Sequence, residues 1–244
     1  MSAENKTAIV TGSSRGIGAA IARRLGRDGV NVVVNYAGRA ADAEAVVAEI
    51  GASAIAVQAD VSDPDAARRL FDEAERRFGG VDILVNSAGI MPPELPPIAD
   101  TDDATFDRLV AVNLKGSFNT LREAARRLRD GGRIVNVSTS VIGMALPGYG
   151  AYAATKAAIE ALAPIMAKEL RGRSITVNTV APGPTATDLF LTGKSNETIE
   201  RLSKAAPLER LGTPDDIAAA VAFLVGPDGG WINGQTLRAN GGII

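Results

Sequence analysis

The sequence contains no histidine and no cysteine in its 244 residues. Their absence excludes a Ser-His-Asp or Cys-His catalytic group, a disulfide, and a zinc site made of the usual nitrogen and sulfur ligands. Any acid-base chemistry must therefore use carboxylates, lysine, tyrosine, hydroxyls or a cofactor, and we expect no metal.

A charge excess and long hydrophobic runs are also absent. The 26 basic and 28 acidic residues leave a formal charge of −2, which gives no field that favours nucleic acid or an anionic membrane surface. No apolar run approaches the ~20 residues of a membrane span, and the polar start of the chain does not have the pattern of a secretory signal. We expect a soluble, cytoplasmic protein with neither a nucleic-acid nor a membrane partner.

Hydrophobic periodicity predicts strands that alternate with helices along the whole chain. We expect strands at 7–11, 31–35, 54–58, 81–86, 133–137, 174–180 and 235–238. We expect helices at 16–28, 40–50, 65–78, 103–130 (one or two helices), 151–171 and 214–225. The strands are nearly continuous apolar runs, which are typical of a parallel sheet covered by helices on both faces. The pattern predicts a doubly wound α/β fold, and because no linker or repeat divides the chain, one domain over residues 1–244.

A glycine-rich segment, TGSSRGIG at residues 11–18, joins the first expected strand to the first expected helix. Glycines let the backbone turn sharply and approach a pyrophosphate, and the helix N-terminus offers unpaired N–H groups to the anion. The spacing G-x-x-x-G-x-G differs from the commonest dinucleotide fingerprint. Taken alone, the cluster also fits a tight strand-to-helix turn.

The end of the second expected strand, residues 34–39, has no carboxylate. Folds that prefer NAD usually place an acidic residue there to bind the ribose 2′-hydroxyl. Arg15 and Arg39 offer charge-assisted hydrogen bonds to a 2′-phosphate instead. This favours NADP(H) as the cofactor, with NAD(H) as the second choice, unless both arginines are only solvated surface charges.

Tyr152 and Lys156 lie four residues apart near the start of an expected helix, and this spacing puts them on one face. In a chain without histidine they are the obvious acid-base candidates. An ammonium ~4 Å from a phenol contributes roughly 4 kcal/mol at an effective dielectric of about 20, which lowers a pKa of ~10 by up to about three units. We expect the pH profile of the activity to report this pair, although such pairs also arise by chance on helices.

Four further motifs complete a pattern that resembles the short-chain dehydrogenase/reductase family. They are NSAG at 86–89, Asn113 in VNLKG, the serines that follow RIVNV, and PGPTAT at 182–187. With TGSSRGIG and YAATK they cover essentially the whole chain in the family's order, as in 3-oxoacyl-[acyl-carrier-protein] reductase-like and glucose dehydrogenase-like members. The resemblance implies a Rossmann-type sheet of about seven strands and a homotetramer. It also implies hydride transfer between a nicotinamide and a small-molecule carbonyl or secondary alcohol.

The resemblance implies roles for three side chains in that reaction. Tyr152 exchanges a proton with the substrate oxygen. Lys156 lowers the pKa of Tyr152 and binds the nicotinamide ribose. Asn113 holds a water in a proton relay behind Lys156.

A hydroxyl after the fifth strand is expected to orient the substrate oxygen, and three residues compete for that role. The family's usual spacing before the tyrosine gives Thr139, whereas alignment on the following Val-Ile-Gly favours Ser140, and Ser138 is the third candidate. We expect Ser140 because the loop that follows can be one residue short and because Thr139 would place an extra methyl against the substrate.

For the cofactor, the resemblance implies contacts from the end of each strand. The phosphates are expected at Gly12, Ser14, Arg15, Gly16, Ile17 and Gly18, and the adenosine at Asn35, Arg39, Asp60 and Val61. The nicotinamide and its ribose are expected at Asn86, Ala88, Gly89, Tyr152, Lys156, Pro182, Gly183, Thr185 and Thr187. Two alternatives stay open: Asp60 as a helix cap and Asn86 as a tie between strands.

The loops beyond the strand ends are expected to hold the substrate, as in other open α/β sheets. Their apolar residues are Met91, Leu95, Met144, Leu146, Tyr149, Leu189, Phe190 and Leu191, which predict an apolar pocket unless they only pack against the core. Residues 188–207 are expected to form a lid, and Pro164 is expected to kink its helix. We expect an NADP(H)-dependent oxidoreductase, and the alternative is a catalytically silent, dinucleotide-binding regulatory protein.

Overall fold

Seven strands form one parallel sheet in the computed structural model, which describes residues 6–92 and 94–244. Their order across the sheet is β3-β2-β1-β4-β5-β6-β7, and every neighbouring pair is parallel. The strands are β1 (Thr7–Val10), β2 (Asn31–Tyr36), β3 (Ala54–Gln58), β4 (Val81–Asn86), β5 (Leu128–Val137), β6 (Thr176–Pro182) and β7 (Thr236–Ala239). The predicted doubly wound sheet of about seven strands is confirmed.

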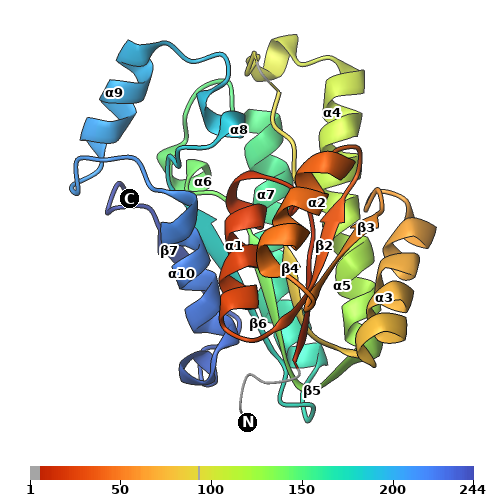
Figure 1. Cartoon of the computed structure of the whole chain (residues 1–244). Helices are drawn as coiled ribbons and strands as arrows, with labels where there is room; N and C mark the ends of the chain where they lie inside the picture. The colour runs from red at the N-terminus through yellow and green to blue at the C-terminus, as the bar shows by residue number, and fades with distance from the viewer. Residues whose placement is uncertain (1–5, 93) are drawn as a thin grey trace.

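Helices cover both faces of this sheet (Figure 1). One face is covered by α1 (Gly16–Arg27), α2 (Ala40–Ile50) and α10 (Pro214–Val225). The other is covered by α3 (Pro64–Phe78), α5 (Ser117–Arg127) and α7 (Gly150–Glu169). Successive strand residues point to opposite faces, so Val32 and Val34 join one buried cluster and Val33 joins the other. The strands are apolar runs because both of their faces are buried.

Short helices follow the carboxyl ends of several strands. They are α4 (Asp103–Leu109), α6 (Val141–Met144), α8 (Asp188–Leu191) and α9 (Asn196–Ala205). Figure 1 shows α8 and α9 projecting beyond the end of the sheet, near the loops that follow β4 and β5. Single 3₁₀ turns lie at Ile98–Asp100 and Pro227–Gly229.

The expected helix at 103–130 is divided and ends early. A π-helical segment, Val110–Gly116, separates α4 from α5, and α5 ends at Arg127. Leu128 already pairs with Val81 of β4, so the chain has turned back into the sheet before Asp130. Pro164 lies inside α7, which continues from Gly150 to Glu169 as one helix.

None of the helices in residues 6–92 and 94–244 is both long enough and apolar enough to cross a bilayer.

Candidate active site

A cavity of about 190 Å³ lies at the carboxyl ends of the strands. Of the predicted cofactor contacts, those that line it are Gly12, Arg15, Gly16, Ile17, Gly18, Gly89, Tyr152, Lys156, Pro182, Gly183, Thr185 and Thr187. The fold therefore brings segments from four distant parts of the sequence to one space.

The glycine-rich turn forms the floor of this cavity where α1 begins. Gly12 has a φ of 61°, and a Cβ on it would lie 2.7 Å from the Cα of Ala88. A Cβ on Gly18 would lie 2.4 Å from the carbonyl oxygen of Gly12. The N-cap residue Arg15 makes no side-chain cap, and the first turn of α1 holds no acidic residue. The N–H groups at the start of α1 are therefore available to an anion, and the turn fits a dinucleotide pyrophosphate.

The Asn35 side chain holds this turn, and a cofactor contact at Asn35 stays a prediction. Its side chain is 2% exposed, its Oδ1 accepts a hydrogen bond from Gly12 N at 3.1 Å, and its Nδ2 donates to Ala59 O at 3.0 Å. The amide thus fixes the backbone of the glycine turn, because its polar atoms are already engaged within the protein.

Asn86 also has a structural role, which is the alternative considered from the sequence. Its Nδ2 donates to Asn136 Oδ1 at 3.0 Å, and its Oδ1 accepts from the Thr120 hydroxyl at 2.5 Å. These bonds tie β4 to β5 and to α5, so the Asn86 side chain is turned away from the cavity.

Arg39 and Asp60 lie outside the cavity. Arg39 Nη1 is 3.2 Å from Asp42 Oδ2 at the start of α2, and Asp60 Oδ1 accepts from the backbone and hydroxyl of Ser62. The residues Ser14, Val61 and Ala88 are likewise absent from its lining. Cofactor contacts at these five positions stay predictions.

Tyr152 and Lys156 reach the cavity from the first turns of α7. Lys156 is buried, and its Nζ donates to Val137 O at 2.9 Å and lies 6.0 Å from the centroid of the Tyr152 ring. Burial lowers the pKa of Lys156 to about 8. Burial raises the pKa of Tyr152 to about 12, against the lowering effect of a hydrogen bond with Thr139. The predicted lowering of the Tyr152 pKa is therefore wrong for this structure, because desolvation of the phenolate outweighs the lowering contribution of Thr139.

Thr139 is the hydroxyl that faces the tyrosine. Thr139 and Tyr152 both line the cavity, and the Thr139 side chain opposes the rise in the Tyr152 pKa. The Thr139 Oγ1 also accepts from Val141 N at 3.2 Å, which fixes its rotamer at the start of α6. Thr139 is the residue that the family's usual spacing before Tyr152 gives.

The expectation of Ser140 does not agree with this geometry. Ser140 is fully buried, and its hydroxyl donates to Ala181 O at 2.9 Å, away from the cavity. The third candidate, Ser138, donates to Glu160 Oε1 of α7 at 2.7 Å.

Comparison with known proteins identifies the family. A family model described as enoyl-(acyl carrier protein) reductase matches residues 12–244. A short-chain type dehydrogenase/reductase of Picea abies is 46% identical over 250 residues, which cover 98% of this chain and 92% of that protein. The chain is a member of the short-chain dehydrogenase/reductase family.

Two further relatives of this dehydrogenase/reductase carry informative names. An NADPH-dependent aldehyde reductase-like protein of Arabidopsis thaliana, described as chloroplastic, is 48% identical over 254 residues, covering 98% of this chain and 94% of that protein. The crystal structure of a short chain dehydrogenase from Burkholderia cenocepacia J2315 in complex with NADP is 41% identical, with a TM-score of 0.93 and coverage of 100% of this chain and 99% of that chain.

Asn113 of this dehydrogenase/reductase lies in the π-helical segment and is fully buried. Its Oδ1 accepts from Ile90 N at 2.8 Å, and its Nδ2 donates to Ile90 O and to the Thr155 hydroxyl. A Cβ on Gly89 would lie 3.1 Å from Lys156 Nζ and 3.4 Å from Asn113 Oδ1. One amide N–H and the Oδ1 thus hold the loop after β4, and the other N–H binds Thr155 of α7. The predicted relay water stays a prediction.

The substrate side of the dehydrogenase/reductase cavity is apolar. Its lining residues there are Met91, Val141, Met144, Leu146, Tyr149, Leu189, Phe190 and Leu202. The sequence predicted six of these but not Val141 or Leu202, and it included Leu95 and Leu191, which do not line the cavity. Ile199 and Leu202 share one face of α9 at a spacing of three residues, which is the signal that would have identified Leu202.

Proposed function

We propose that this protein is an NADP(H)-dependent carbonyl reductase that converts an apolar aldehyde or ketone into the alcohol. The observation that carries the proposal is the meeting of Tyr152, Thr139 and Lys156 with the glycine-rich turn in one cavity. The Arabidopsis relative is named for an NADPH-dependent aldehyde reductase, and the Burkholderia relative was crystallised with NADP. Both names support this choice of cofactor.

Arg15 and the start of α1 are the proposed binding groups for the cofactor phosphates. Arg15 lines the cavity and carries a positive charge with five N–H donors, which suits a 2′-phosphate. Pro182, Gly183, Thr185 and Thr187 also line the cavity, and there we propose the nicotinamide contacts. The bound cofactor supplies the hydride to the carbonyl carbon.

Tyr152 is the proposed proton donor to the carbonyl oxygen. A pKa of about 12 keeps the phenol protonated near neutral pH, and this is the form that reduction requires. We propose that Thr139, in place of Ser140, donates a hydrogen bond to the same oxygen and so holds it within reach of the phenol. Lys156 places a positive charge near the phenol below about pH 8 and stabilises the phenolate as the proton leaves.

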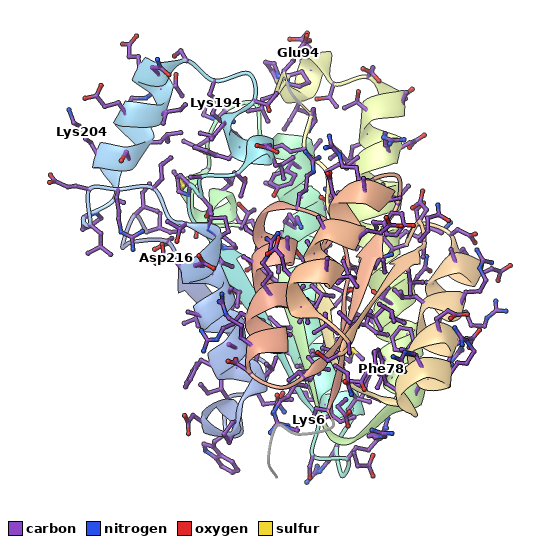
Figure 2. The ribbon with its side chains drawn as sticks, viewed as in Figure 1. Lys6, Phe78, Glu94, Lys194, Lys204 and Asp216 are labelled. Atoms are coloured by element: carbon purple, nitrogen blue, oxygen red, sulfur yellow. The ribbon has the colours of Figure 1, made fainter. Side chains whose placement is uncertain are left out.

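The apolar wall supports a hydrophobic substrate. Leu189 and Phe190 of α8 and Leu202 of α9 line the cavity, and their segment, residues 188–207, is the proposed lid. Lys194 Nζ lies 4.7 Å from the centroid of the Phe190 ring, and Figure 2 shows Lys204 on the outer side of this segment. A lid with polar side chains outside and apolar side chains inside excludes water from the reacting carbonyl.

A homotetramer is the proposed assembly, and the exposed apolar side chains at one edge of the sheet support it. Trp231 is 97% exposed, and Phe223 of α10 and Leu237 of β7 are also exposed. β7 is the last strand of the sheet, so one of its edges is free to meet a second copy of the chain. Light scattering after size-exclusion chromatography tests the assembly. A cytoplasmic location stays a prediction that cell fractionation tests.

The deciding experiment follows NADPH absorbance with aromatic aldehydes, aliphatic ketones, 3-oxoacyl thioesters and, in the reverse direction, polyols with NADP. We expect turnover of apolar aldehydes and ketones, and we expect Tyr152→Phe to lower kcat by about 10² to 10⁴ while NADPH still binds. No turnover of any substrate together with tight NADPH binding would support the catalytically silent alternative.

The choice of Thr139 has its own test. We expect Thr139→Ala to lower kcat by about a hundredfold and Thr139→Ser, which keeps the hydroxyl, to retain most of the activity. Equal activity of Thr139→Ala and the unmodified protein would return the role to another hydroxyl.

A further inference from the structure

We infer that Asn240 is a positioning residue, which acts through the hydroxyl of Ser140 to hold the ends of β5 and β6 in the arrangement that the reaction needs. This inference rests on the proposed function. Asn240 Nδ2 donates to Ser140 Oγ at 3.0 Å across 100 residues of sequence. The same oxygen donates its single proton to Ala181 O at 2.9 Å. One buried hydroxyl therefore joins three segments.

The three segments are the continuations of neighbouring strands. Ser140 N donates to Pro182 O at 2.8 Å, and Gly183 N donates to Ala239 O at 3.0 Å. These bonds extend the β5-β6-β7 ladder up to the cavity wall, where Thr139 and Gly183 lie. Asn240 adds a side-chain link at the point where the ladder ends.

Close packing fixes residues 240–244, the tail that carries Asn240. A Cβ on Gly183 would lie 2.8 Å from Asn240 Cα, and a Cβ on Gly143 of α6 would lie 2.4 Å from Ile244 Cδ1. Asn240 Oδ1 accepts from Gly242 N at 3.0 Å, which sets the direction of the amide. The tail therefore rests directly on the segments that follow β5 and β6.

The chemistry of the bond requires a donor at position 240. The hydroxyl of Ser140 uses its proton on Ala181 O, so it can only accept from a third group. The Asn240 amide supplies that N–H. Without it, the buried Ser140 oxygen keeps only its bond to Ala181 O, and the link from Ser140 to position 240 is lost. Thr139, the adjacent residue, then loses part of its fixed orientation toward Tyr152.

The test compares Asn240→Ala and Ser140→Ala with Asn233→Ala. Asn233 is a matched control because its Oδ1 accepts from Val177 N at 2.8 Å and so joins β6 to the segment before β7, at the end of the sheet away from the cavity. The readouts are kcat, KM for NADPH and for the carbonyl, the deuterium isotope effect with NADPH labelled at the transferred hydrogen, and the melting temperature.

We expect Asn240→Ala and Ser140→Ala each to lower kcat about tenfold and to raise the isotope effect on kcat, because small misplacements at a reacting centre mainly slow the chemical step. KM for NADPH should stay within about twofold of the unmodified protein. The double variant should be no slower than Ser140→Ala, since Ser140→Ala already removes the bond between Ser140 and Asn240. Asn233→Ala should lower the melting temperature while kcat stays within about twofold. An unchanged kcat in Asn240→Ala, or multiplied effects in the double variant, would overturn the inference.

Hydrogen exchange of backbone amides gives a readout that needs no turnover. We expect Asn240→Ala to speed exchange in peptides covering 136–143 and 180–186, and Asn233→Ala to leave them unchanged. Normal exchange in Asn240→Ala contradicts the inference even if no substrate is found. Turnover of the unmodified protein decides the proposed function separately. Should Asn240→Ala fail to fold, Ser140→Ala removes the same bond from the other side.

Discussion

Helix α1, on the cofactor side of the cavity, has six buried residues, whereas none of the residues of α8 and α9, on the substrate side, is buried. The cofactor side is built from backbone in close contact, as at Gly12 and Gly18, and from buried amides such as Asn35. The substrate side is built from side chains on short, exposed helices. Substitutions on the cofactor side should therefore affect folding and cofactor binding together. Substitutions on the substrate side should affect substrate binding alone.

The largest effect is expected for the buried Lys156 of the cofactor side. The pKa of Lys156 is about 8, below the value of ~10.4 in the unfolded chain. Between these two pH values the unfolded state binds more protons than the folded state, so the free energy of unfolding rises with pH in that range. Below about pH 8 the buried Lys156 is charged, so its full desolvation penalty lowers the free energy of unfolding. Lys156→Met should therefore lower kcat at least about a hundredfold. It should also raise the free energy of unfolding at pH 7 by about 2 kcal/mol, a gain that disappears by about pH 10.

Urea unfolding of Lys156→Met at several pH values measures this gain. The exposed Lys168 of the same helix supplies the control, because Lys168→Met should change neither kcat nor the pH dependence of stability. A Lys156→Met protein that is less stable at pH 7 would show that the buried ammonium is well compensated.

The next effect concerns the glycine turn. Gly12 and Gly29 both have a positive φ, but a Cβ on Gly12 would lie 2.7 Å from Ala88 Cα, whereas one on Gly29 would meet nothing within 4 Å. Both alanine variants should lose about 1 kcal/mol from backbone strain. Gly12→Ala alone should lose further stability and bind NADPH at least about tenfold more weakly, as measured by thermal unfolding and NADPH fluorescence titration. Equal behaviour of the two variants would mean that the turn relaxes to make room.

A smaller effect is expected on the substrate side. Leu202→Ala should raise KM for an apolar carbonyl about fivefold, corresponding to roughly 1 kcal/mol of lost apolar burial, with kcat and melting temperature nearly unchanged. Leu191→Ala is the control, because Leu191 belongs to the same segment but does not line the cavity. A marked loss of stability in Leu202→Ala would place Leu202 in the core instead of at the substrate.

The smallest effect is expected where the two sides meet. Arg15 Nη1 lies 3.9 Å from Asp188 Oδ2, and both side chains are largely exposed. Asp188→Asn should strengthen NADPH binding about twofold, an effect that salt reduces, and should not change NADH binding. Asp42→Asn removes the partner of Arg39 and should have no effect. If Asp42→Asn strengthens NADPH binding instead, Arg39 is the phosphate contact.

The sequence predicted the positions of the glycine-rich turn and of the Tyr152 and Lys156 pair because these features depend on short-range geometry. A turn that needs glycines and a helix that begins at Gly16 leave a direct pattern in the sequence, and the i, i+4 spacing places Tyr152 and Lys156 on one face without further information. The parallel sheet follows from its apolar strands in the same way.

The remaining features depend on contacts between distant residues. The Ser140 hydroxyl bonds with Ala181 O and with Asn240, which is 100 residues away, and the spacing before Tyr152 does not reveal these partners. The pKa of Tyr152 was misjudged because spacing gives the position of the ammonium but not the desolvation of the phenol. The roles of Asn35 and Asn86 depend on partners in neighbouring strands.

The π-helical segment Val110–Gly116 has a consequence for how related sequences are compared. A π turn accommodates about one more residue than an α turn, and one residue corresponds to a rotation of about 100° around the helix axis. Deleting one residue there would restore a regular helix and rotate α5 relative to α4. Thr120 would then face away from Asn86, and Asn113 away from the loop after β4. A single-residue gap at this place in a related chain therefore indicates different hydrogen-bond partners inside the protein, not a shorter loop.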